Sequence, residues 1–177
     1  MKKIVIKSFA KINLTLDVLG VLDNGYHELA MIMQQILLCD DVQIKWTEAQ
    51  NADVGTGETG DASGIKIELS TNRKFLPTDN RNLAYKAADA MIERYGKGKS
   101  GTIRIDIKKR IPVAAGLAGG SGNAAAVLHG LNKLWGLGLD VAALCEIGAG
   151  LGSDIPFCIG GPTALATGRG EQIEPLP

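Results

Sequence analysis

Apolar and polar residues alternate along much of the first half of the chain, and this period of two predicts β-strands. The segments that alternate, or that form short apolar runs typical of strands, are residues 3–8, 13–19, 31–38, 42–46, 65–69, 102–108, 157–159 and 163–166. Between residues 51 and 64 almost no large apolar side chain occurs, so we predict an exposed connection there. The region before it is therefore predicted to be rich in β-structure.

Three further segments repeat apolar residues every three or four positions, which predicts helices. These segments are residues 83–96, about 122–137 and 140 to about 150. Asp140 is the expected N-cap of the third helix, because its carboxylate can accept a hydrogen bond from a free backbone N–H of the first turn. Residues 152–156 are predicted to form a turn. The chain is thus predicted to combine strands and helices.

Composition narrows the class of ligand. The chain has 177 residues, of which 45% are hydrophobic, so it can bury the core of one domain, or of one domain and a fragment. Nineteen basic residues balance nineteen acidic ones, so the chain has no excess of positive charge that would indicate binding to a nucleic acid or a membrane surface. This balance favours a small ligand. No apolar run is long enough for a membrane span or a signal peptide, so a cytoplasmic location is expected.

A glycine-rich segment that opens onto an alanine-rich helix is the strongest sign of chemistry. It comprises Pro112, Val113, Ala114, Ala115, Gly116, Leu117, Ala118, Gly119, Gly120, Ser121 and Gly122. Glycines let backbone N–H groups approach an anion, and a helix N-terminus directs further N–H groups at it, so the segment is predicted to hold phosphates. Its spacing is neither that of a P-loop nor that of a dinucleotide fold. The alternative is that the glycines only allow close packing of loop and helix.

Two charged residues are candidates for catalysis. Lys11 lies in an apolar strand, on one face with Lys7, Phe9 and Asn13 if the strand is regular. Asp154 lies between flexible and apolar residues, where it could act as a general base in phosphoryl transfer. The alternatives are a solvated lysine on the outer face of the strand and an aspartate that only forms a turn.

Tyr26 and His27 follow a predicted turn and could stack on, and hydrogen-bond to, a planar base. His27 taken alone would be interpreted as a turn histidine. Because the chain has only two histidines and no Cys-x-x-Cys pair, no metal site is predicted from these residue types, and the metal ligands remain unknown.

Four segments together resemble one enzyme family. They are Ala-Lys-Ile-Asn-Leu at 10–14, Asn-Gly-Tyr-His-Glu-Leu at 24–29, the glycine-rich segment from 112 to 121, and Gly-Ser-Asp-Ile-Pro-Phe at 152–157. They occur in the order found in the 4-diphosphocytidyl-2-C-methyl-D-erythritol kinase family of the GHMP (galacto-, homoserine, mevalonate and phosphomevalonate) kinase superfamily. The resemblance implies an α+β (two-layer α/β) fold whose N-terminal half is similar to domain 2 of ribosomal protein S5.

The resemblance also implies an activity and a set of residues. The reaction would be ATP-dependent phosphorylation of the 2-hydroxyl of 4-diphosphocytidyl-2-C-methyl-D-erythritol in the non-mevalonate isoprenoid pathway, with Mg2+. By position, Asp154 would be the base and Lys11 its partner, and residues 112–122 would hold the triphosphate, with Ser121 near the phosphates or the magnesium. Asn82 would lie by the adenine. Asn13, Tyr26 and His27 would bind the substrate, the latter two at its cytosine.

Two departures from the family pattern stand out. Gly122 replaces a serine that is usual there, and loss of that hydroxyl is expected to weaken ATP binding by about 0.5–1.5 kcal/mol. The chain is also shorter than the family's members. We therefore expect residues 1–160 to be the N-terminal ATP-binding domain and 161–177 to begin the connection to a missing C-terminal domain, whose absence would expose an apolar face and favour self-association.

Three alternatives remain open on the sequence alone. The chain could be another small-molecule kinase of the superfamily, against which Gly-Tyr-His at 25–27 argues. It could be a nucleotide-binding fragment without catalysis, because half of the cleft would be missing. A purely structural domain would require the separate motif matches to be accidental.

Overall fold

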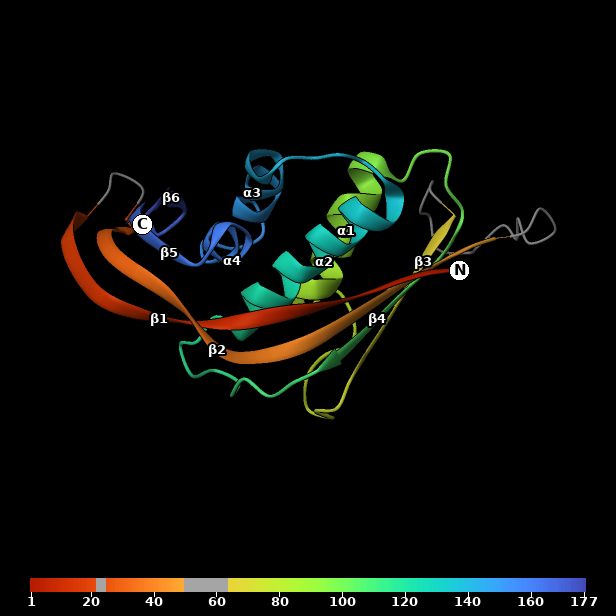
Figure 1. The fold of residues 1–177 in the computed structure, drawn as a ribbon, viewed down its shortest axis with the longest axis horizontal. Helices are drawn as coiled ribbons and strands as arrows, with labels where there is room; N and C mark the ends of the chain where they lie inside the picture. The colour runs from red at the N-terminus through yellow and green to blue at the C-terminus, as the bar shows by residue number, and fades with distance from the viewer. Residues whose placement is uncertain (22–24, 50–63) are drawn as a thin grey trace.

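The computed structural model describes residues 1–21, 25–49 and 64–177, and its helices lie on one side of a curved sheet (Figure 1). Its elements are β1 (Lys2–Val21), β2 (His27–Glu48), β3 (Ile65–Thr71), α1 (Leu83–Tyr95), β4 (Gly101–Lys108), α2 (Gly119–Trp135), α3 (Val141–Ala149), α4 (Ile155–Gly160), β5 (Thr163–Gly168) and β6 (Gln172–Pro175). The predicted α+β class is confirmed. The predicted turn before Tyr26 and the connection over 51–64 lie largely outside the described residues.

The sheet is organised around β2, the longest strand. β1 pairs with β2 in antiparallel register along nearly its whole length. On its other edge β2 has two successive neighbours, β5 along residues 29–34 and β4 along residues 41–48. β3 extends the sheet beyond β4 in parallel, and β6 extends it beyond β5, so the order is β3-β4-β2-β5-β6 with β1 against β2.

The first two strands are longer than the sequence predicts. The segments 31–38 and 42–46, predicted as separate strands, are one strand, because only the neighbour of β2 changes between Gln34 and Asp41 while β1 stays paired. The segments 3–8 and 13–19 are likewise one strand. The register of β1 shifts between Phe9 and Ala10, so the prediction that Lys7 and Lys11 share a face is wrong: Lys7 is exposed and Lys11 is buried.

Helices α1 and α2 cover the sheet and enclose the main core. That core contains aliphatic side chains of the sheet and of both helices, among them Ile44, Ile103, Ile105, Met91 and Leu128. Each such side chain contributes about 1.5–3 kcal/mol on full burial.

Small residues on α2 bring that helix close to the sheet. A Cβ at Gly130 would lie 2.2 Å from Ile44 Cδ1, so a larger residue would require the buried Ile44 side chain to shift. Three consecutive alanines, 124–126, are buried one turn earlier on the same helix. The alanine-rich sequence thus serves close packing as well as helix formation.

Helix boundaries agree with the sequence predictions apart from α2. α1 ends at Tyr95 with Gly96 as its C-cap, and Asp140 caps α3 by accepting from the Ala143 N–H at 2.8 Å. α2 begins at Gly119, about three residues earlier than predicted, and ends at Trp135. Its first turn is therefore part of the glycine-rich segment itself.

The prediction of a strand at 157–159 is wrong, because these residues belong to helix α4. A short apolar run cannot distinguish a buried strand from a buried helix by periodicity alone. Phe157 packs in a second, smaller core with Met31, Met33, Ala164 and Ala166, which joins α4 to β2 and β5. This packing fixes the position of Asp154, the residue just before α4.

β5 and β6 are strands of the sheet, so the end of the described chain is integrated with the rest. The boundary at 160/161 and the missing second domain stay predictions. Leu14, Leu16 and Val18 on β1 are more than half exposed, and self-association through such a face also stays a prediction. Among the described residues, no helix has the length and apolarity needed to cross a bilayer.

Candidate active site

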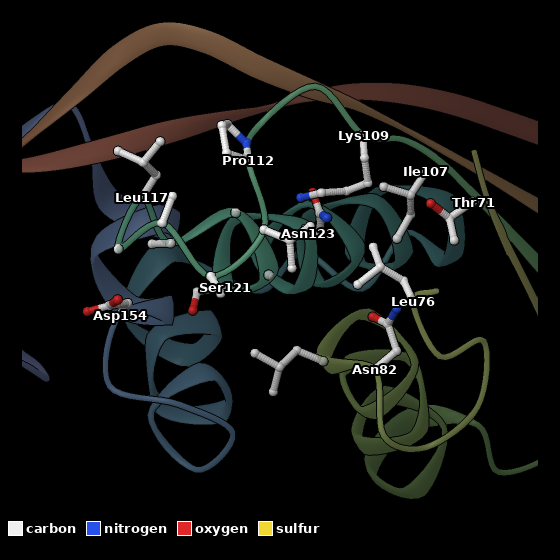
Figure 2. Close-up of a pocket in the computed structure, with 18 of the residues that line it drawn as sticks. Thr71, Leu76, Asn82, Ile107, Lys109, Pro112, Leu117, Ser121, Asn123 and Asp154 are labelled. Carbon is white, nitrogen blue, oxygen red and sulfur yellow. The ribbon is translucent and has the colours of Figure 1, made fainter. Parts of the chain in front are cut away.

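A cleft of about 480 Å³ lies between the glycine-rich loop, the N-terminus of α1 and the ends of β3 and β4. Its lining comprises Lys11, Thr71, Leu76, Pro77, Arg81, Asn82, Leu83, Ile107, Lys109, the residues 112–121, Asn123 and Asp154. Figure 2 shows Asp154 and Ser121 toward one end of this cleft and Asn82 and Leu76 toward the other. The structure thus brings together most of the predicted nucleotide-binding residues and both predicted catalytic residues.

The loop adopts a backbone that is strained at two alanines. Ala114, Gly116 and Ala118 have φ angles of 58°, 72° and 52°, in the left-handed region. This conformation costs an alanine about 1–2 kcal/mol, and such strain is concentrated at functional sites. Ala118 is the N-cap of α2 and makes no side-chain capping bond, so the first N–H groups of α2 are left for a ligand.

Gly119, the next residue, is favoured by limited space rather than by its φ angle. A Cβ at Gly119 would lie 2.9 Å from Lys109 Nζ and 3.0 Å from Ile111 Cγ2. The loop is also tied to the first strand, because the Lys11 N–H donates to the Leu117 carbonyl at 3.1 Å. The sequence prediction of a close-packed loop and that of a phosphate-binding loop are therefore both compatible with this geometry.

A buried ion pair that the sequence analysis missed supports the base of the loop. Asp40, fully buried on β2, forms an ion pair with Lys109, which is 5% exposed. The same carboxylate accepts from the backbone N–H groups of Arg110 at 2.6 Å and Ile111 at 2.9 Å. It thus satisfies two N–H groups where the chain leaves β4 and turns into the loop. The only sequence signal was an acidic residue within a largely apolar strand.

Lys11 and Asp154 face each other at one end of the cleft, although they are 143 positions apart in the sequence. Lys11 Nζ lies 3.8 Å from Asp154 Oδ2 and donates to Asn13 Oδ1 at 3.1 Å. Lys11 is 7% exposed, whereas the Asp154 side chain is one-third exposed and so is accessible to a ligand. Asp154 occupies the N-cap position of α4 but makes no capping bond, which leaves its carboxylate available for chemistry.

Cys158 lies one turn after Asp154 on α4. Burial raises the pKa of its thiol to about 12, with the nearby Asp154 carboxylate acting in the same direction. The thiol is therefore neutral at physiological pH and does not compete as a nucleophile.

Asn82 lines the cleft, but its side chain also holds the local structure together. Its Oδ1 accepts from the Ala84 N–H at 3.0 Å as the N-cap of α1, and its Nδ2 donates to the Pro77 carbonyl at 2.9 Å. Only its second amide hydrogen and remaining lone pairs are left for a ligand.

Gly122 is the one residue of the predicted loop that does not line the cleft. A Cβ at this position would point at β1, 2.6 Å from Ser8 Oγ and 3.3 Å from the Phe9 carbonyl oxygen. The Cα–Cβ bond of a serine at this position would therefore point toward β1 rather than into the cleft. This geometry gives no support to the expectation that the missing hydroxyl weakens ATP binding.

A Gly122→Ser variant is therefore expected to lose about 1–3 kcal/mol of folding stability through overpacking, with no gain in ATP affinity. Urea unfolding and ATP titration would measure the two effects. Ser8→Ala in the same chain removes the closest clashing atom and should recover most of the loss. Tighter ATP binding by the Gly122→Ser variant would contradict this assignment.

The remaining predicted substrate residues are not part of the cleft lining. Tyr26 is exposed, and the Arg169 guanidinium carbon lies 5.3 Å from the centre of its ring. His27 begins β2 and is exposed. Neither residue lines the cleft that holds Lys11 and Asp154, so their assignment to a cytosine stays a prediction.

Part of this chain matches a known protein family. Residues 82–162, which include the whole glycine-rich loop, α2 and Asp154, match the family described as GHMP kinases N terminal domain. The predicted resemblance to this family is thus confirmed.

Curated proteins share extensive sequence with this chain. The chain is 48% identical over 172 residues to 4-diphosphocytidyl-2-C-methyl-D-erythritol kinase of Bacillus cereus strain AH187, covering 97% of this chain and 54% of that protein. The same figures hold for the enzyme of Bacillus anthracis. The chain therefore spans about half the length of the curated relatives it matches.

Solved structures have the same fold as this chain. A crystal structure of 4-(cytidine 5'-diphospho)-2C-methyl-D-erythritol kinase aligns with a TM-score of 0.75 and 34% identity, over 98% of this chain and 55% of that one. Mevalonate kinase of Methanococcus jannaschii aligns with a TM-score of 0.63 and 13% identity, over 99% of this chain and 56% of that one. The second likeness is one of fold alone.

Proposed function

We propose that the protein to which this chain belongs transfers the γ-phosphoryl group of ATP to the 2-hydroxyl of 4-diphosphocytidyl-2-C-methyl-D-erythritol, in the non-mevalonate isoprenoid pathway. The observation that carries this proposal is the Lys11–Asp154 pair at one end of a cleft lined by the glycine-rich loop. A buried cation, an accessible carboxylate and a phosphate cradle are the parts that phosphoryl transfer requires.

The cleft fits a nucleoside triphosphate in its chemistry. The uncapped first turn of α2 and the loop before it provide backbone N–H groups for the phosphates. The other end, with Leu76, Pro77 and Leu83, is apolar and suits a flat base. Lys109 contributes no free positive charge, because its ammonium is paired with Asp40. The triphosphate would therefore be held mainly by the backbone of the loop and by Lys11.

Asp154 would act on the acceptor hydroxyl. Its carboxylate accepts the hydroxyl proton as the oxygen forms a bond to the γ-phosphorus and the bond to the β,γ-bridging oxygen breaks, which releases ADP. Lys11 would orient the carboxylate and stabilise negative charge on the transferred group. Asn13, bonded to Lys11, would hold the lysine and the acceptor in place.

Magnesium would supply neutralisation of the phosphate charge. Over the part of the chain that the structure describes, no group of three or more His, Cys, Asp or Glu side chains forms a metal site. This is compatible with Mg2+, which is commonly bound by one or two protein ligands together with phosphate oxygens and water. Ser121, which lines the cleft, is the residue that would contact it.

Substrate-dependent ADP release tests the proposal. The chain would be incubated with Mg-ATP and either 4-diphosphocytidyl-2-C-methyl-D-erythritol or homoserine, and we expect ADP only with the first. ADP with homoserine alone would instead favour another GHMP kinase activity. ATP binding without ADP release in either case would mean that this chain is a nucleotide-binding module. That alternative is considered because the chain spans about half the length of its curated relatives.

A further inference from the structure

An unpartnered oxygen faces the nucleotide cleft. Over the described residues, three buried side-chain atoms lack a hydrogen-bond partner: Ser8 Oγ, Asn123 Oδ1 and Trp135 Nε1. Of these residues only Asn123 lines the cleft, and it is 3% exposed. A buried carbonyl oxygen without a donor is unfavourable, so this atom is expected to have a partner in the liganded protein.

The position of Asn123 restricts the part of the nucleotide that it can reach. It belongs to the first turns of α2, beyond the residues that surround the phosphates. Figure 2 shows it between Ser121, on the side of Asp154, and Leu76 and Ile107, on the apolar side. A base inserted between the apolar side chains would therefore lie against the Asn123 amide.

Other polar groups near the apolar end of the cleft are already engaged. Lys109 is paired with Asp40, and both ends of the Asn82 amide are hydrogen-bonded. The Thr71 hydroxyl oxygen accepts from the Arg73 N–H at 3.3 Å. Asn123 Oδ1 is thus the buried acceptor in this part of the cleft that remains for a ligand.

The chemistry of a purine nucleotide identifies the complementary group. Phosphate oxygens are acceptors and would repel this oxygen, whereas the exocyclic amino group of adenine has two N–H donors and lies on the base. A carbonyl at the same place, as in hypoxanthine or guanine, would oppose one acceptor with another. A site built around a hydrogen bond discriminates strongly against analogues that lack the donor, because the protein group is then left unpaired.

We propose that Asn123 is a specificity-determining residue whose Oδ1 accepts a hydrogen bond from the exocyclic amino group of the donor nucleotide. It selects an amino-bearing purine over one that bears a carbonyl. This inference rests on the proposed function, in that it takes ATP to be the nucleotide of the cleft.

Equilibrium titration of the unmodified chain is the first test. The dissociation constants for ATP, ITP and N6,N6-dimethyl-ATP would be compared at one magnesium concentration. ATP is expected to bind about 5- to 160-fold more tightly than the other two, which is the cost of leaving a buried acceptor unpaired, converted at a factor of ten per 1.4 kcal/mol. ATP and ITP binding equally would overturn the inference.

The second test uses Asn123→Leu, which keeps the approximate shape and removes the acceptor. Its affinity for ATP should fall about tenfold while its affinity for ITP should not fall, so that the preference disappears. Ser8→Ala is the matched control, because it removes another unpartnered buried oxygen outside the cleft and should leave the preference unchanged. Circular dichroism and the unfolding midpoint would establish that each variant is folded.

The outcomes separate this inference from the function on which it rests. Failure of the unmodified chain to bind any of the nucleotides would overturn the proposed function and the inference together. ATP binding with an unchanged preference in Asn123→Leu would overturn the inference alone. A loss of affinity for 2'-deoxy- or 3'-deoxy-ATP in the unmodified chain, but none for ITP, would reassign the Asn123 contact to a ribose hydroxyl and would likewise overturn it.

Discussion

Replacement of Asp154 by asparagine is expected to lower substrate-dependent ADP release by about 10²–10⁴-fold, the usual contribution of a positioned general base. The side chain keeps its shape, but the amide cannot accept the hydroxyl proton and no longer pairs with Lys11, 3.8 Å away. The measurement is the turnover number with 4-diphosphocytidyl-2-C-methyl-D-erythritol and Mg-ATP. ATP affinity should change little, because the loop that would hold the phosphates is intact.

The matched control for this prediction is Asp106→Asn, the same chemical change at an exposed position on β4 outside the cleft. It should leave turnover within about twofold of the unmodified chain, because substitutions of exposed residues away from the active site and the core have small effects. If Asp154→Asn retained turnover within a few-fold of the unmodified chain, the carboxylate would not be the base. A large loss accompanied by an equal loss in the control would indicate general damage to the fold.

Removal of the Asp40 carboxylate is expected to destabilise the protein by about 3–5 kcal/mol, a loss typical of breaking a buried ion pair. Asp40→Ala would leave the Lys109 ammonium unpaired in a buried site, together with the backbone N–H groups of Arg110 and Ile111. Such a loss is a large share of the stability of an ordinary domain. Urea unfolding, followed by tryptophan fluorescence, would measure it.

The neighbouring carboxylate offers a control of the same type. Asp41 is also paired, with Lys7 and Arg110, but the side chains of this cluster are partly exposed, so Asp41→Ala should cost about 1 kcal/mol or less. The double variant Asp40→Asn, Lys109→Met removes both buried charges and keeps an acceptor for the two N–H groups, so it should be more stable than Asp40→Ala. Equal losses at Asp40 and Asp41 would contradict the role assigned to the buried pair.

The contribution of Asp41 to folding stability depends on pH. Hydrogen bonds from Arg110 and Lys7 lower the pKa of Asp41 from 3.8 to about 2. A carboxylate with a lowered pKa in the folded state stabilises the fold above its ordinary pKa and loses that contribution as the pH falls from about 4 to 2. The small stabilisation by Asp41 is therefore present at neutral pH, where the control is measured.

Local sequence determined a large part of the secondary structure. The period of alternation located the central strands, and the three- and four-residue period located α1 to within a residue or two of its ends. Asp140 and Gly96 were recognisable as helix ends, because capping depends on the residue and its immediate neighbours. The glycine-rich loop could be predicted for the same reason, since backbone freedom and the start of a helix are local properties.

Features that depend on distant contacts were not accessible in this way. The register shift after Phe9, which buries Lys11, depends on how β1 pairs with β2. α4 was mistaken for a strand because only its packing against Met31 and Met33 distinguishes the two. The Asp40–Lys109 pair and the unpartnered Asn123 oxygen are consequences of tertiary burial, which the local sequence around these three residues does not specify.

By itself, the sequence determined the α+β class, and it made residues 112–121 the predicted phosphate-binding segment and Lys11 and Asp154 the candidate catalytic residues, through local pattern and family resemblance. Only the tertiary structure decided that Lys11 and Asp154 meet, that Gly122 faces β1 instead of the cleft, and that one buried acceptor remains for a ligand. The physical reason is that charge pairing, close contact and desolvation depend on distances between residues far apart in the chain, which local sequence does not specify.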